Sequence, residues 1–114
     1  MKIIDVTSGK IIGDRIQLAN RFLPRLKGLM FRDHLDPGEG ILLYPCNSIH
    51  MFFMKIPLDI LFLDEDMVVL KQINGIKPWQ ISTIVKNAKY VLELGYGSFQ
   101  PNDRLEGHQL SLLK

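Results

Sequence analysis

Hydrophobic residues recur along the chain in short runs, several of which alternate with polar residues. Runs of this kind are typical of β-strands when they are rich in β-branched and aromatic side chains and are bounded by glycine, proline or acidic residues. The pattern predicts seven or eight short strands, drawn from these stretches: Lys2–Thr7, Ile11–Ala19, Ile41–Tyr44, Ser48–Met54, Leu58–Leu63, Met67–Ile73, Ala88–Leu94 and Gln109–Leu113.

Two of the connections between these runs are short enough to predict β-hairpins. Ser8-Gly9-Lys10 separates the first two runs, and the acidic turn Asp64-Glu65-Asp66 separates Leu58–Leu63 from Met67–Ile73. Adjacent strands joined by such tight turns pair in antiparallel fashion.

One segment has helical periodicity. In RFLPRLKGLMFR, residues 21–32, Pro24 suits the first position of a helix, and Leu26, Leu29 and Met30 recur at the spacing of one helical face. A short helix is therefore expected here. Many short strands with one short helix predict a mainly β fold, either an antiparallel sandwich or a partly closed barrel, in a single domain spanning residues 1–114.

The composition fits a globular protein. The chain has 114 residues, of which 46% are hydrophobic and 23% are charged, so disorder and a fibrous architecture are not indicated. The formal net charge of +2 does not favour a nucleic-acid partner. Lysine and arginine outnumber acidic residues in the first 32 positions, whereas acidic residues are in excess in the rest of the chain. The basic N-terminal part could face an anionic ligand or a membrane surface, or it could simply form a solvated face.

Cys46 is the only cysteine, which excludes a disulfide within the chain. Hydrophobic runs are much shorter than the roughly 18 residues of a membrane-spanning helix, and Asp5 interrupts the N-terminus before the core of a signal peptide could form. We expect a cytoplasmic protein without a membrane span, as a monomer or weak homodimer.

Cys46, His50 and Met54 would share one face if residues 46–54 formed a straight strand. These are ligands that a soft metal prefers, and Cys46 with His50 could also form a nucleophile and its base. On a straight strand the Cα atoms of Cys46 and His50 would be roughly 13 Å apart, which is too far for them to share a metal ion or to form a nucleophile–base pair. A small buried cysteine and a hydrogen-bonded histidine are the simpler reading, and no metal is predicted.

Asp59 lies in the apolar run Leu58–Leu63. A carboxylate in such a setting has to be paired, hydrogen-bonded or protonated. His50 or an arginine of residues 21–32 is the expected partner, either within a functional site or as a structural ion pair.

Several separate blocks carry a family resemblance. They are Arg25 with Gly28-Leu29-Met30-Phe31-Arg32, Gly40-Ile41-Leu42, Cys46 with Ser48-Ile49-His50, Phe53-Met54-Lys55, Pro57-Leu58-Asp59-Ile60, Phe62-Leu63-Asp64, and Tyr90-Val91-Leu92-Glu93-Leu94 followed by Gly97. On these residues the chain resembles the family known as domain of unknown function 192, or uncharacterised protein family 0127. It departs at Gly107-His108, where the family usually has Gly-Asp. The resemblance implies a compact, mostly β fold and no known reaction, substrate or cofactor.

The leading hypothesis is a small β domain that binds an anionic or polar small molecule, or a protein partner, without catalysis. The predicted ligand-binding residues are Arg25, Arg32, His50, Met54, Lys55 and Asp59. The alternatives are an enzyme acting on an anionic small molecule, with Asp59 or His50 as general base, and a structural module with a large exposed apolar patch.

Overall fold

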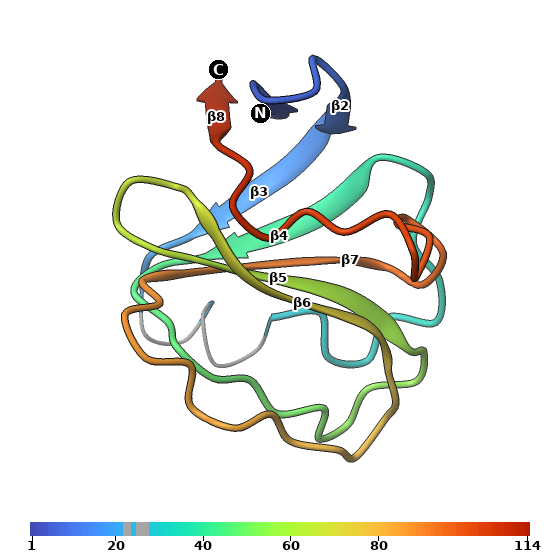
Figure 1. Cartoon of the computed structure of the whole chain (residues 1–114). Coiled ribbons are helices and arrows are strands. Elements are labelled where there is room, and N and C mark those ends of the chain that lie inside the picture. The colour runs from blue at the N-terminus through green and yellow to red at the C-terminus, as the bar shows by residue number, and fades with distance from the viewer. Residues whose placement is uncertain (22–23, 25–27) are drawn as a thin grey trace.

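The fold is given by a computed structural model that describes residues 1–21, 24 and 28–114. The strands are β1 (Lys2–Asp5), β2 (Ile11–Gly13), β3 (Arg15–Ala19), β4 (Glu39–Leu43), β5 (Leu58–Leu63), β6 (Val69–Ile76), β7 (Tyr90–Gly95) and β8 (Leu110–Leu113). They form a three-stranded sheet in the order β2-β1-β8 and a five-stranded sheet in the order β3-β4-β7-β5-β6 (Figure 1).

The mainly β prediction is confirmed, and so are both hairpins, since β1 pairs with β2 and β5 with β6 in antiparallel register. The described strands lie in two separate sheets, which favours the sandwich over the barrel. One pair differs from the antiparallel prediction. β3 and β4 are parallel, with Arg15 opposite Glu39 and Ala19 opposite Leu43, so the chain returns between them through residues 20–38.

Strand β5 is buried along its whole length because both faces of the five-stranded sheet are covered. One face packs against the smaller sheet and forms the inter-sheet core, which includes Leu61 of β5, Ile3 of β1 and Leu110 of β8. The other face forms the loop-side core, which includes Ile60 of β5 and Met51 from a loop. Within the described residues there is no helix with the length and apolar character that crossing a bilayer requires.

The loop-side core is covered by two segments, residues 44–57 and 77–89, which we call the loop layer. They run side by side and exchange backbone hydrogen bonds, among them Met51 N to Gln80 O at 2.7 Å, Trp79 N to Met51 O at 2.8 Å and Val85 N to Asn47 O at 2.8 Å. In Figure 1 the loop layer lies at the bottom, and the three-stranded sheet with both chain ends lies at the top.

The predicted strand Ser48–Met54 is wrong. This segment has only an isolated bridge between His50 and Ile81, and it turns at Phe52 and Phe53. Phe53 has a φ of 63°, a left-handed conformation that no regular strand contains. Five of the twelve residues of the predicted helix, 22–23 and 25–27, lie outside the described ranges, and Gly28, Leu29, Met30 and Phe31 form turns.

Candidate functional site

Asp59 is fully buried on the inter-sheet side of β5. Its carboxylate accepts hydrogen bonds from the backbone amides of Gly75 at 2.9 Å, Gly97 at 3.0 Å and Phe99 at 3.1 Å. These amides stand where His50 or an arginine was expected. Asp59 therefore ties β6 and the segment after β7 to the middle of the sheet.

Three other predicted site residues belong to the loop layer. Met54 is buried in the loop-side core, whereas Lys55 is exposed. His50 is half-buried, its ring stacks on Phe52 with centroids 5.0 Å apart, and its Nδ1 lies 3.3 Å from the Phe52 amide nitrogen. The five-stranded sheet separates these residues from Asp59. The expected convergence of His50, Met54 and Asp59 on one concave surface does not occur.

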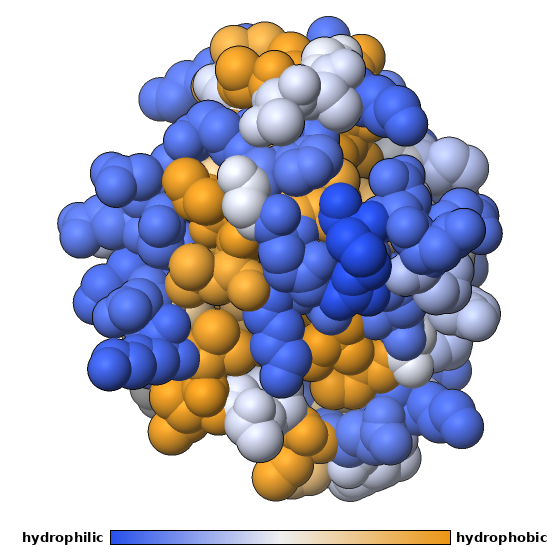
Figure 2. Space-filling model, viewed as in Figure 1, coloured by the Kyte–Doolittle hydropathy of each residue, from blue (hydrophilic) through white to orange (hydrophobic). Residues whose placement is uncertain are grey.

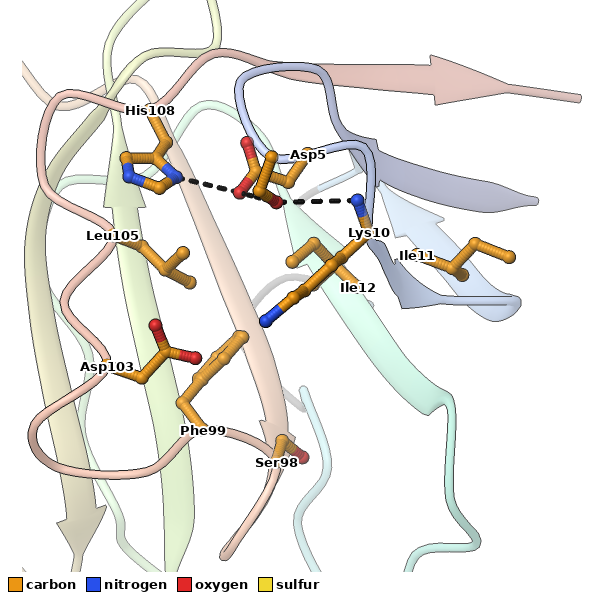
Figure 3. A pocket seen from close by; sticks show the side chains of 10 residues that line it. Asp5, Lys10, Ile11, Ile12, Ser98, Phe99, Asp103, Leu105 and His108 are labelled. Carbon is orange, nitrogen blue, oxygen red and sulfur yellow. Dashed lines mark hydrogen bonds and ion pairs between the residues drawn. The ribbon is translucent and has the colours of Figure 1, made fainter.

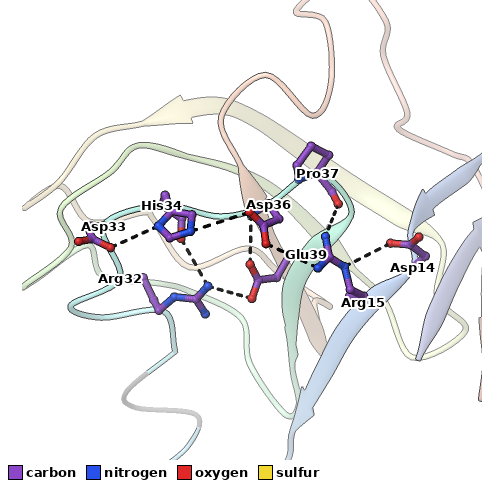
Figure 4. Close-up of polar contacts among 8 residues, drawn as sticks. All are labelled: Asp14, Arg15, Arg32, Asp33, His34, Asp36, Pro37 and Glu39. Atoms are coloured by element: carbon purple, nitrogen blue, oxygen red, sulfur yellow. Dashed lines mark hydrogen bonds and ion pairs between the residues drawn. The ribbon is translucent and has the colours of Figure 1, made fainter.

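Arg32 is held in a polar cluster beside the start of β4 (Figure 4). Its guanidinium donates to the carboxylate of Glu39 at 2.8 Å, and the second oxygen of Glu39 accepts from the Asp36 amide at 3.1 Å. Both hydrogen bonds lower the pKa of Glu39, and the one from Arg32 has the larger effect. Arg32 thus has a structural partner of its own, and Arg25 lies outside the described residues.

Glu93 presents a buried carboxyl group to the loop-side core. It lies opposite Ile41 of β4 and Ile60 of β5 and is 5% exposed. Its Oε1 would lie 3.3 Å from a β-carbon added to Gly28. Burial in this apolar setting raises the pKa of Glu93 to about 7.

A group of ring side chains lies on the outside of the loop layer and the adjoining residue 31. We call it the aromatic surface. Phe53 is its centre, with ring centroids 5.6 Å from Phe31 and 5.1 Å from Trp79; Phe52 lies 5.9 Å from Trp79. His50 completes the group by stacking on Phe52.

A pocket of about 210 Å³ lies between the β1–β2 connection and the segment after β7 (Figure 3). Its lining includes the pair formed by Asp5, which is fully buried, and His108, whose Nδ1 is 2.7 Å from Asp5 Oδ2. The Ser8 hydroxyl donates to the same carboxylate at 2.7 Å. Burial alone would raise the pKa of Asp5, but the hydrogen bonds from Ser8 and His108 outweigh it, so the pKa is lowered.

Charged side chains from two different segments face this pocket. Figure 3 shows the Lys10 side chain reaching across the opening towards Phe99 and Asp103. The apolar wall is formed by Ile12, Phe99 and Leu105. No described residue of the predicted ligand-binding set lines it.

Comparison with known proteins identifies a family and several relatives of this chain. The family model described as DUF192, Uncharacterized ACR, matches residues 4–112. The chain belongs to the DUF192 family. A UPF0127 protein of Thermococcus sibiricus is 32% identical over 100 residues, which is 83% of this chain and 64% of that protein's length.

Two solved structures share the DUF192 fold of this chain at 26% sequence identity. One, from Sinorhizobium meliloti, is described as a "putative transcription regulator"; it has a TM-score of 0.77, covering 96% of this chain and 89% of that one. The other, a protein of unknown function from Novosphingobium aromaticivorans, has a TM-score of 0.79, and the match covers 98% of this chain and 84% of that one.

The pocket residues were missed because they are far apart in the sequence. Asp5 and His108 are separated by 103 positions, and the only hint was that Gly107-His108 departs from the pattern expected from the family resemblance. The Cys46 thiol donates to the Ser48 carbonyl oxygen at 3.0 Å. Among the described residues, no three side chains of His, Cys, Asp or Glu come together in a way that could hold a metal ion.

Proposed function

We propose that this DUF192 protein is a non-catalytic binding domain that takes a small polar ligand with an anionic group into the pocket of Figure 3. One observation carries the proposal. Lys10 and Asp103 face the same pocket, and within the described part of the chain neither side-chain charge belongs to an ion pair.

The arrangement suits a ligand with two polar ends. An anionic group beside Lys10 would gain a charge-assisted hydrogen bond, and an ammonium or hydroxyl group beside Asp103 would gain another. Ile12, Phe99 and Leu105 would contact the apolar part between them. Small zwitterions and hydroxy acids have this chemistry, and the pocket volume of about 210 Å³ restricts the ligand to a small molecule.

Binding without catalysis fits the hydrogen bonds of the pocket better than a hydrolytic reaction does. A hydrolytic site of the serine or cysteine type needs a nucleophile whose hydroxyl or thiol donates to the catalytic histidine. Here the Ser8 hydroxyl donates to Asp5, as does the imidazole of His108, so the two side chains share one acceptor. The enzyme alternative with Asp59 as base has no support, because that carboxylate is inaccessible and already accepts three hydrogen bonds.

The experiment is a nuclear magnetic resonance titration of the whole chain with a panel of free amino acids and small hydroxy acids. A ligand of the proposed kind shifts the backbone resonances of Lys10, Phe99 and Asp103 together. Lys10→Gln and Asp103→Asn should each weaken its binding about tenfold or more, because each removes one charge-assisted hydrogen bond.

The matched controls are Lys114→Gln and Asp66→Asn, which neutralise exposed charges that do not line the pocket. They should leave the affinity unchanged. The proposal fails if no compound of the panel shifts the pocket resonances, or if the pocket variants bind as tightly as the parent chain.

A further inference from the structure

The loop layer exposes large apolar side chains on its outer side. Phe52, Phe53 and Trp79 are 41%, 50% and 60% exposed, and Ile81 and Ile84 are 66% and 73% exposed. The inner side of the same segments packs on the loop-side core through Ile49, Met51 and Met54. Figure 2 shows apolar surface along the lower edge of the molecule, where the loop layer lies.

The backbone holds several of these side chains in unusual conformations. Phe31, Phe53 and Trp79 have φ angles of 68°, 63° and 70°, in the left-handed region that bulky residues rarely adopt. Hydrogen bonds fix these positions, since Phe31 N donates to Phe53 O at 3.1 Å and Trp79 N donates to Met51 O at 2.8 Å. Strained backbone of this kind is retained where the surrounding structure enforces it, and it concentrates at functional sites.

The charge of the loop layer has one sign. Residues 44–57 and 77–89 contain Lys55, Lys77, Lys86 and Lys89 and neither aspartate nor glutamate. A broad groove of about 680 Å³ beside Trp79 also receives Lys71 and Lys77. Asp33, from a neighbouring segment, is an acidic residue near Lys55. The layer as a whole combines exposed apolar groups with positive charge.

We propose that the loop layer docks onto the surface of an anionic lipid membrane. Phe53, Trp79 and Ile84 would enter the interface between headgroups and acyl chains, where aromatic side chains are favoured. Lysines around them would face anionic headgroups, an attraction worth about fivefold in affinity for each lysine close to the surface. Apolar burial and charge attraction together are the basis of peripheral membrane binding.

The residue types favour a lipid surface over the other partners of a basic, apolar face. Single-stranded nucleic acid is bound by stacking on aromatic rings, whereas the two most exposed large apolar side chains of the layer, Ile81 and Ile84, are aliphatic. Protein interfaces are depleted in lysine, which is the only charged residue type of this layer. The surface is also independent of the ligand pocket, because none of the pocket residues belongs to the loop layer.

Trp79 is the only tryptophan of the chain, so its fluorescence reports directly on this surface. The experiment adds vesicles of phosphatidylcholine, alone or mixed with phosphatidylglycerol, to the whole protein. With the anionic vesicles we expect a blue shift of the emission and quenching by brominated acyl chains. Both effects should weaken at high salt, which screens the headgroup charge, and should be much smaller with phosphatidylcholine alone.

Two variants and two matched controls test the contribution of each part. The double variant Lys55→Gln with Lys77→Gln should bind anionic vesicles about 25-fold less tightly. Phe53→Gly should weaken binding about tenfold while keeping the fold, because glycine tolerates the left-handed φ. Lys2→Gln with Lys114→Gln removes two exposed charges outside the layer, and Asn87→Gly makes the same backbone change at a φ of 70° without removing apolar surface. Both controls should bind like the parent chain.

The proposal is overturned if anionic vesicles leave the Trp79 emission unchanged. It is also overturned if the protein binds these vesicles while brominated lipid does not quench the Trp79 emission. Equal loss of binding in the variants and in their controls would also overturn it. So would self-association that buries Trp79 while vesicle binding is absent, because the occupant of the surface would then be a second copy of the chain.

Discussion

The carboxylate of Asp59 accepts a hydrogen bond at 3.1 Å from the backbone amide of Phe99, forty positions further along the chain. The same carboxylate also holds the amides of Gly75 and Gly97. A family motif residue that sequence reasoning assigned to ligand binding thus stabilises the junction between β5, β6 and the segment that forms one wall of the pocket.

Replacing Asp59 by alanine should destabilise the protein severely. Three backbone donors around a fully buried position would lose their acceptor, and the cost should be about 4 kcal/mol of unfolding free energy, measured by urea denaturation. Asp66→Ala is the control, since this aspartate lies exposed in the β5–β6 turn, and it should change stability by less than about 0.5 kcal/mol. A small effect of Asp59→Ala would mean that water replaces the carboxylate and that the position is open to solvent.

Gly40 should not tolerate alanine, whereas Gly95 should. A β-carbon on Gly40 of β4 would overlap the backbone oxygen of Glu93 and lie only 2.6 Å from Leu94 Cδ2, so two adjacent strands would have to separate. We expect Gly40→Ala to lower the unfolding free energy by about 3 kcal/mol.

Gly95 in β7 is the matched control for Gly40, because an added β-carbon there would lie 3.5 Å from Leu35 Cβ, an ordinary contact. Thermal and urea unfolding of Gly95→Ala should stay within about 1 kcal/mol of the parent chain. Equal tolerance at both positions would show that β4 and β7 can move apart at little cost.

The strands were predictable where the local sequence decides them. Leu58–Leu63 was predicted with the bounds that β5 has, because a run that is apolar except for Asp59 lies between Pro57 and an acidic turn. Residues 48–54 have an equally strand-like composition but do not form a strand. There the Ile49 amide donates to the Ser82 side chain at 2.9 Å, and Phe53 turns the chain. The conformation of residues 48–54 therefore depends on a segment about thirty residues further along the chain.

The candidate site was less predictable because its contacts are distant in the sequence. The need for a partner at Asp59 was correctly inferred from the apolar run around it. The partner itself was not, since backbone amides leave no signature in a sequence. The pair of Asp5 and His108 joins the two ends of the chain, and no local pattern points to it.

Truncating His108 should weaken the fold at the pocket. Asp5 would keep hydrogen bonds from the Thr7 amide at 3.0 Å and from Ser8, but its buried charge would lose the imidazole. We expect His108→Ala to lower the unfolding free energy by about 2 kcal/mol. His34→Ala is the matched control, because the contact between His34 and Asp33 is exposed to solvent and screened by it, so its loss should leave the stability unchanged. Urea denaturation of both variants at neutral pH compares them, and equal effects would contradict a structural role for the Asp5–His108 pair.

Glu93 should make the protein less stable as the pH rises. Because burial raises its pKa from 4.5 to about 7, the folded protein keeps a proton that the unfolded chain releases between these values. The stability associated with the neutral acid is therefore fully present below about pH 4.5 and is lost as the pH rises through about 7. The loss should reach about 3 kcal/mol in mildly alkaline solution.

Comparing Glu93→Gln with the parent chain isolates this effect, because glutamine does not titrate while the other ionisable groups are unchanged. The difference in unfolding free energy between the two proteins should shift in favour of the variant by about 2 to 3 kcal/mol from about pH 5 to about pH 8. Glu65→Gln, at an exposed turn position, should show no such trend. Parallel pH profiles for Glu93→Gln and the parent chain would mean that a cation or bound ligand neutralises this carboxylate in solution, which would make the space beside Gly28 a further place to search for a ligand.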